Sequence, residues 1–274
     1  MNVILDYWPL LVGLSLTGIA SGVFAGLLGI GGGAIMVPAL AFAFEALGFD
    51  DNVSQHVAVA SSLAIIIPTG LMSARAHYGR GAVDLGILRL WAPFVLAGTL
   101  AGGLMAGLFS GDVLRLVFGV MVLLVALNIV TPFQKRLMGH LSGSPTTHRV
   151  AASLVGYVSA LMGVGGGSLS VPTIAAFGET MHKAVGTGAA IGVFIAIGGT
   201  LGFIVSGWRE AGLPPLSLGY VNLVALVLVG GFAALMAPLG AALAHRLQQQ
   251  TLKYVFAVFL VLVGVNMIWN VVAG

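Results

Sequence analysis

The sequence predicts an all-α polytopic membrane protein with about ten transmembrane segments, arranged as two inverted five-segment repeats whose second helices are short or broken. Composition is the first observation behind this prediction: 59% of the 274 residues are hydrophobic and 7% are charged, against roughly 25% charged in a soluble domain. Apolar stretches that recur from end to end are the second. A glycine-rich motif that occurs twice is the third.

The apolar segments form two sets of five. In each set the second segment is shorter than the roughly 20 residues that a helix needs to cross the hydrocarbon core. Residues 1–30 contain Asp6 but no Lys or Arg, so the first segment is expected to remain as a helix and not to be cleaved as a signal peptide. The predicted segments are 8–28, 34–47, 56–74, 86–109 and 113–131, followed by 150–163, 168–178, 184–206, 216–244 and 252–272.

Three pairs of matching stretches indicate a duplication. GVFAGLLGIGGGAIMVP from Gly22 and GYVSALMGVGGGSLSVP from Gly156 are identical at eight of seventeen positions. LRLVFGVMVLLVALNIV from Leu114 resembles LKYVFAVFLVLVGVNMI from Leu252, and a weaker match aligns His56 with His182. An odd number of segments in each repeat forces the second copy to enter the membrane inverted, which is the plan of many secondary transporters.

The polar stretch at 132–149 separates the two halves. We therefore predict a first inverted repeat at 1–131, a cytoplasmic linker at 132–149 and a second inverted repeat at 150–274. Because Lys and Arg in short loops favour the cytoplasmic side, we expect a multi-pass protein of the plasma membrane with both termini external and only Arg115 and Arg209 outside. The basic residues expected inside are Arg75, Arg80, Arg89, Lys135, Arg136, Arg149, Lys183, Arg246 and Lys253.

Each copy of the motif holds four glycines in five residues, at 29–33 and at 163–167, and is followed by Pro38 or Pro172. A helix is not expected to continue through such a run, because each Gly costs about 1 kcal/mol relative to Ala. Unwound backbone inside a bilayer is tolerated only where it is buried in protein or lines a polar cavity. Close helix packing is the competing explanation for these glycines.

A short helix is expected after each break, with the proline in its first turn. Its free N–H groups and the positive end of its dipole would then face the cavity and attract an anion. With the halves inverted, the two helix starts should meet near the midplane and form one substrate site. The glycines expected to line that site are Gly31, Gly32, Gly33, Gly165, Gly166 and Gly167.

Small polar side chains in the third span of each half are further candidates for this site. Ser61, Ser62 and Thr187 can hydrogen-bond an anion without placing a charge in the membrane, and the amide of Gln55 can do the same. The competing explanation is that hydroxyls in membrane helices bond back to carbonyls of their own helix.

Titratable residues are expected near the ends of the spans. His56 and His182 occupy matching places close to helix starts, where a gating or proton-sensing role competes with a packing role at the boundary. Arg115 and Glu45 lie near predicted span ends and are expected to extend to the headgroups. The bilayer core is then nearly free of ionisable groups.

Several classes of function are disfavoured. The chain has no Cys, which excludes thiolate metal sites and thiol catalysis, and it has no HExxH motif, so we expect no enzyme, no metal and no cofactor. The scattered basic residues do not form a nucleic-acid-binding face. The expected partners are the lipid bilayer and a small anion, while the small-residue face of Gly98, Gly102 and Gly103 would permit a homodimer.

The paired loops GLLGIGGGAIMVP and ALMGVGGGSLSVP, in a duplicated chain of this length, resemble the TauE/SafE family of sulfite and organosulfonate exporters. The resemblance covers essentially the whole chain, and both copies of the motif are intact. It implies outward transport of sulfite or a small sulfonate through the plasma membrane. Carried onto matching positions, it points to the same glycines, to Pro38 and Pro172, and to Ser168.

The sequence therefore predicts a carrier that exports a small anion, sulfite or an organosulfonate, by alternating access around the two helix breaks. An anion channel and an importer of a related small anion would use the same features, and the sequence does not separate them from an exporter. An intramembrane enzyme would need a nucleophile with a base, or paired carboxylates, within the membrane.

Overall fold

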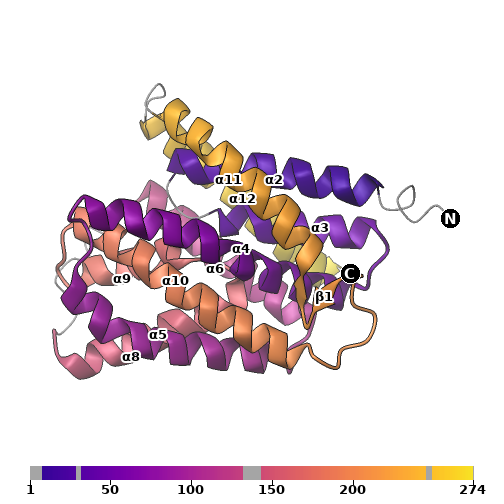
Figure 1. The fold of residues 1–274 in the computed structure, drawn as a ribbon, viewed down its shortest axis with the longest axis horizontal. Coiled ribbons are helices and arrows are strands. Elements are labelled where there is room, and N and C mark those ends of the chain that lie inside the picture. The colour runs from indigo at the N-terminus through magenta and orange to yellow at the C-terminus, as the bar shows by residue number, and fades with distance from the viewer. Residues whose placement is uncertain (1–7, 29–31, 132–142, 245–248, 274) are drawn as a thin grey trace.

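The computed structural model describes residues 8–28, 32–131, 143–244 and 249–273. These residues form ten α-helices and one short β-hairpin (Figure 1). The elements are α2 (Trp8–Leu28), α3 (Gly33–Ala46), α4 (Asp51–Gly79), α5 (Leu85–Ala106), α6 (Gly111–Val130), α8 (Pro145–Met162), α9 (Gly166–Ala176), α10 (Met181–Ser206), β1 (Ser217–Leu218), β2 (Val221–Asn222), α11 (Leu223–Ala244) and α12 (Gln249–Ala273).

Five helices are long and apolar enough to cross a membrane: α4, α5, α6, α10 and the part of α12 from Tyr254 to Ala273. Large apolar side chains such as Val227 and Leu262 point away from the protein interior, as expected for helices that face lipid. The prediction of an all-α membrane protein is therefore confirmed.

Each predicted apolar segment contains one helix, but some boundaries differ. The segment predicted from residue 216 begins as the β1–β2 hairpin, and α11 starts only at Leu223. Pro214 and Pro215 lack the N–H that a helix needs, and Gly219 adopts a φ of +55°. Helix α8 begins at Pro145, inside the stretch predicted as a linker, because Ser144 caps its first turn.

One end of the bundle, here called the Trp91 end, gathers the ends of α4, α5, α8, α9 and α10. The Trp91 indole donates from Nε1 to His148 Nδ1 at 3.0 Å, and the His148 ring stacks on Phe177 with centroids 3.8 Å apart. Asp84 accepts from the Ile87 amide and pairs with Lys183 at 3.2 Å. The hydrogen bond from the Ile87 amide, and next the contact with the Lys183 ammonium, hold the pKa of Asp84 below its ordinary value.

The opposite end, here called the Arg115 end, contains an ionic cluster around a buried arginine. Arg115 of α6 is 5% exposed and pairs with Glu45 of α3, with Asp51 of α4 at 3.5 Å and with Asp112 at 3.8 Å. The expectation that Arg115 extends to the headgroups is therefore wrong, because carboxylates from α3, α4 and its own helix hold the guanidinium inside the protein.

The two short helices start inside the bundle and end at opposite ends of it. Helix α3 begins where Gly33 lies against Gly163, and it ends near Glu45, which pairs with Arg115. Helix α9 begins where Gly166 lies against α10, and the next residue after it, Phe177, reaches the Trp91 end. In Figure 1, α3 lies beneath α2, and α9 lies on the far side of the bundle beside α10.

Glycines pack α5 directly against α8 and α10. A Cβ atom on Gly98 would overlap the Ser153 carbonyl oxygen, and one on Gly102 or Gly103 would lie 2.8 Å from a carbonyl oxygen of α8 or α10. This face of α5 is therefore covered by helices of the same chain. The sequence-based expectation that it would be free for a homodimer contact is wrong.

Candidate functional site

Helix starts of two kinds occur in the described chain. Helices α4, α5, α6, α8 and α10 begin with a polar residue whose side chain accepts a hydrogen bond from a first-turn amide. Helices α3 and α9 begin after Gly32 and Gly165, which provide no side-chain cap. Because glycine has no side-chain acceptor, first-turn amides of both helices remain available to another partner.

The uncapped start of α3 touches the turn that leads into the uncapped start of α9. We call residues 32–33 the first tip and residues 163–166 the second tip. A Cβ atom on Gly33 would lie 2.9 Å from the Gly163 carbonyl oxygen and 3.1 Å from the Cα of Val164. Ile66 of α4 lies against both tips, 3.2 Å from the Cβ position of Gly33 and 3.3 Å from that of Gly165. The two glycine runs thus meet inside the protein.

The backbone at the tips explains why the sequence uses glycine there. Gly32 has a φ of +71° and Gly163 a φ of +70°, in the left-handed region that favours glycine. Gly163 ends α8 in the way that a glycine after a helix commonly does, with its N–H bonded to the Ala160 carbonyl at 3.2 Å. The predicted interruption between α8 and α9 is present, and Gly31 lies outside the described residues.

Helix packing accounts for Gly166 in the second tip. A Cβ atom on Gly166 would overlap the Gly188 carbonyl oxygen and lie 2.7 Å from the nitrogen of Gly192. Gly165 differs, because its φ of −75° and ψ of −178° suit any residue and its Cβ would meet only the side chain of Ile66. Gly167, in the first turn of α9, is half-buried. Within one motif, close packing thus explains the glycine at Gly166, and the left-handed backbone conformation explains the glycine at Gly163.

The two prolines lie deeper in the half-helices than predicted. Pro38 and Pro172 are inside α3 and α9, past the first turn, because each helix starts within the glycine run itself. A proline there cannot donate to the carbonyl four residues earlier, which leaves the carbonyls of Ala34 and Ser168 without that helical hydrogen bond. Both half-helices therefore carry weakened backbone bonding close to the tips.

The four predicted hydroxyl residues divide into two pairs. Ser62 donates to the Gly163 carbonyl at 2.9 Å, and Ser168 donates to the Gly165 carbonyl at 3.2 Å, so both lie at the second tip. Ser61 instead accepts from the backbone amide of Asn222 at 2.9 Å. The Thr187 hydroxyl accepts from the backbone amide of Asp84 at 2.9 Å, which directs it to the Trp91 end.

The two predicted gating histidines have different surroundings. His56 is 1% exposed, its ring stacks on Tyr220, and its two nitrogens lie 2.7 Å and 3.0 Å from the carbonyl oxygens of Asn52 and Ala106. A neutral imidazole can donate to one of these carbonyls, whereas the imidazolium can donate to both. His182 is exposed at the start of α10. The two histidines therefore occupy matching positions in the sequence but different environments in the structure.

Apolar side chains around the tips were not predicted. Val37 of α3 and the backbone of Val59 approach the Cβ position of Gly163 at 2.9 Å, and Ile66 contacts both tips. The spacing of Val59, Ser62 and Ile66 along α4 is a helical-face pattern that could have identified them. Among the described residues in contact at the tips, none is ionisable, so backbone amides and hydroxyls supply the polarity.

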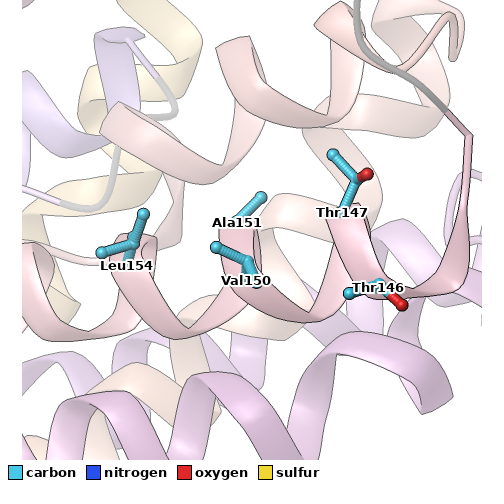
Figure 2. Close-up of a pocket in the computed structure, with 5 residues that line it drawn as sticks. All are labelled: Thr146, Thr147, Val150, Ala151 and Leu154. Atoms are coloured by element: carbon cyan, nitrogen blue, oxygen red, sulfur yellow. The ribbon is translucent and has the colours of Figure 1, made fainter.

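Two surface hollows lie elsewhere. A cavity of about 490 Å³ between α3, α6 and α12 is lined by Pro38, Glu45, Arg115 and Asn266, among others. A second hollow of about 340 Å³ is lined only by residues of α8 (Figure 2). Because the side chains in Figure 2 project from one helix and are mainly apolar, that hollow is an open outer surface and not a binding site.

This arrangement places the protein among the helical membrane proteins in which interrupted helices meet inside the bundle. Many secondary transporters have this architecture. Residues 14–267 match the family described as sulfite exporter TauE/SafE, and the chain belongs to this family. The protein is therefore a membrane transporter.

Curated relatives agree with this assignment. A probable membrane transporter protein of Haemophilus influenzae is 32% identical, with 92% of this chain and 96% of the relative covered. Probable membrane transporter protein YunE of Bacillus subtilis is 29% identical, with 94% and 97% covered. A probable membrane transporter protein of Methanocaldococcus jannaschii is 21% identical, with 95% of each chain covered. No solved structure matches this chain significantly.

Proposed function

We propose that this transporter exports a small oxyanion, sulfite or an organosulfonate, across the plasma membrane. The observation that carries the proposal is the contact between the uncapped start of α3 and the turn that leads into the uncapped start of α9, at the first and second tips. Helix-start amides and the positive end of the helix dipole attract negative groups. Two such starts offer one anion two sets of donors, and the family description makes sulfite the first anion to test.

The mechanism we infer is alternating access by two inverted repeats, residues 1–131 and 150–274, joined by the linker at 132–149. Support comes from the opposite courses of α3 and α9, which leave the tips toward the Arg115 end and the Trp91 end respectively. Alternating access would expose the tips first to one end and then to the other.

The direction of transport is inferred from charge. The basic residues Arg75, Arg80, Arg89, Arg149 and Lys183 lie toward the Trp91 end, which we assign to the cytoplasm, so both termini are external. Efflux of an anion from a negative cell interior is favoured by about 2.3 kcal/mol per charge per 100 mV. The absence of ionisable groups among the described residues at the tips fits an anion that is driven by the membrane potential.

Flux from proteoliposomes preloaded with sulfite, under an imposed potential, tests the proposal. We expect saturable, potential-driven efflux that external substrate accelerates by exchange. A non-saturable current would indicate a channel, and flux that proceeds only inward would indicate an importer. Lack of flux for sulfite, sulfoacetate and methanesulfonate alike would contradict the proposal.

A pair of glycine variants ties that flux to the tips. Gly33→Leu places a side chain where the tips touch and should abolish efflux. Gly231→Leu on α11 is the matched control, because nothing lies within 4 Å of its Cβ position, and it should keep wild-type efflux.

A further inference from the structure

Gln55 of α4 is buried without a hydrogen-bond partner. Its side chain is 0% exposed, and among the described residues it alone has both polar side-chain atoms buried and unpaired. Leaving buried polar groups unpaired destabilises a protein, and such groups are uncommon in folded proteins. The side chain therefore calls for a partner that the described residues do not provide.

Gln55 lies one helical turn away from the residues of α4 that touch the tips. Gln55, Val59, Ser62 and Ile66 follow one another at spacings of four, three and four residues, so they share one face of α4. The other three all touch the tips: Val59 and Ser62 contact Gly163, and Ile66 contacts Gly33 and Gly165. Gln55 continues this face by one turn toward the Arg115 end.

The polar neighbours of Gln55 on the same helix are all paired. The Ser54 hydroxyl lies 3.5 Å from the Phe49 carbonyl oxygen, the two nitrogens of His56 face carbonyl oxygens, and Ser61 accepts from Asn222. The neighbouring polar groups of α4 thus have hydrogen-bond partners, and the side-chain amide of Gln55 does not. On α4 the unpaired side chain lies on the face that meets the tips, and single unpaired atoms also occur on other helices, at Asn128, Ser159, Ser170 and Thr200.

The surroundings also favour a particular charge on the occupant. Arg115 is already balanced by Glu45, Asp51 and Asp112, and the described residues at the tips supply only dipoles. The Born cost of burying an ion rises with the square of its charge, so a dianion costs roughly four times as much as a monoanion. A site built from neutral donors therefore suits a single negative charge.

We propose that Gln55 is a substrate-binding residue, and that its amide donates to an oxygen of a singly charged oxyanion held at the tips. The inference rests on the proposed function and adds to it a specificity residue and a preference for monoanions. The amide nitrogen offers two N–H donors and its oxygen can accept from a protonated oxygen of the substrate. Hydrogensulfite and monosulfonates fit this chemistry, whereas sulfate does not.

The decisive variant is Gln55→Met, which keeps the length of the side chain and removes its polar atoms. We expect two opposite effects in purified protein and proteoliposomes. Without substrate, the melting temperature should rise by roughly 2–4 °C, because a buried unpaired amide is removed. In the flux assay, the KM for methanesulfonate should rise by about tenfold to a hundredfold, because a hydrogen bond to a charged group is lost.

Thr200→Val is the matched control, because it removes another buried, unpaired polar atom, on α10. It should not lower the melting temperature, and it should leave the KM unchanged. A lower melting temperature for Gln55→Met would show that the amide holds the fold together and would overturn the inference. An unchanged KM in Gln55→Met would overturn it as well.

Two further outcomes separate this inference from the function on which it rests. If the wild-type protein transports neither methanesulfonate nor sulfite, the result contradicts the proposed function itself. Wild-type protein that transports methanesulfonate, but handles sulfate with a KM within about threefold of it, refutes the monoanion preference. A stabilising shift of the melting temperature by methanesulfonate, lost in Gln55→Met, would support the assignment independently of flux.

Discussion

The two short helices α3 and α9 both begin in copies of the repeated glycine motif, but they contact the rest of the protein in different ways. Helix α9 begins with Gly166 in backbone contact with α10, and the residue that follows it, Phe177, stacks on His148. Helix α3 begins with Gly33 against the second tip and ends near Glu45, which is paired with Arg115. Both helices are thus packed against the bundle, since α3 also buries Val37, Leu40 and Phe44, but α3 adds an ion pair at its end.

This difference between α3 and α9 shows that the glycine motif determines where a helix is interrupted and not how the short helix after it is attached. Two copies of the glycine run produce two helix interruptions, but they do not produce two equivalent attachments. Backbone contact between α9 and α10 leaves little room for α9 to shift. The end of α3 is attached through an ion pair whose Glu45 side chain is 27% exposed, and such a contact can exchange with water more readily than a packed backbone can.

The largest expected effect is that of Gly166→Ala, which would separate α9 from α10. The added methyl group would overlap the Gly188 carbonyl, so we expect a loss of about 3 kcal/mol in the free energy of unfolding and a melting temperature lower by roughly 6–10 °C. Thermal unfolding in detergent measures the loss. Gly231→Ala, in open space on α11, is the control. Equal stability of the two variants would contradict the close α9–α10 contact.

Removal of the ionic attachment of α3 should have the next largest effect. Arg115→Gln leaves Glu45 without its cation, and we expect a loss of about 2 kcal/mol, below the value for a fully buried pair because Asp51 and Asp112 are exposed. Hydrogen exchange should accelerate at the end of α3 and not in α9. Arg209→Gln, at an exposed position, should change neither quantity, and equal acceleration in both half-helices would contradict the distinction between them.

Gly33→Ala and Gly165→Ala test the tips themselves with a smaller change. A methyl group on Gly33 meets backbone atoms at 2.9 and 3.1 Å, whereas one on Gly165 meets only the Ile66 side chain at 3.3 Å. We expect about 1–2 kcal/mol of destabilisation for the first variant and a nearly unchanged melting temperature for the second. The reverse order would show that the tips are arranged differently.

The smallest expected effect concerns the Trp91 end, where α9 is anchored. Because the pKa of Asp84 is lowered in the folded protein, its ionised carboxylate stabilises the fold above its unfolded pKa, and this stabilisation is lost as the pH falls through the lower, folded pKa. Asp84→Asn keeps an N-cap but removes the charge. Its melting temperature should be lower than that of the wild type by about a degree or two at pH 7, and the difference should diminish as the pH falls below the ordinary pKa of an aspartate, about 4. A difference independent of pH would contradict this account.

The helix interruptions could be predicted from sequence because their cause is local: a run of glycines does not sustain a helix in either half. Partners could not be predicted, because they come from distant parts of the chain. The hydroxyl of Thr187 is directed away from the tips by the amide of Asp84, and Arg115 is buried by Glu45 and Asp51. Nothing in the residues around Thr187 or Arg115 indicates these contacts.

The direct backbone packing of α5 on α8 and α10 has a consequence for movement. Where Gly98, Gly102 and Gly103 touch neighbouring main chains, no side chains intervene that could change rotamer and let one helix slide past another. The three helices must therefore travel together as a single stiff slab. Any opening or closing of the protein is confined to the seams that border this slab, among them those with α4 and α6.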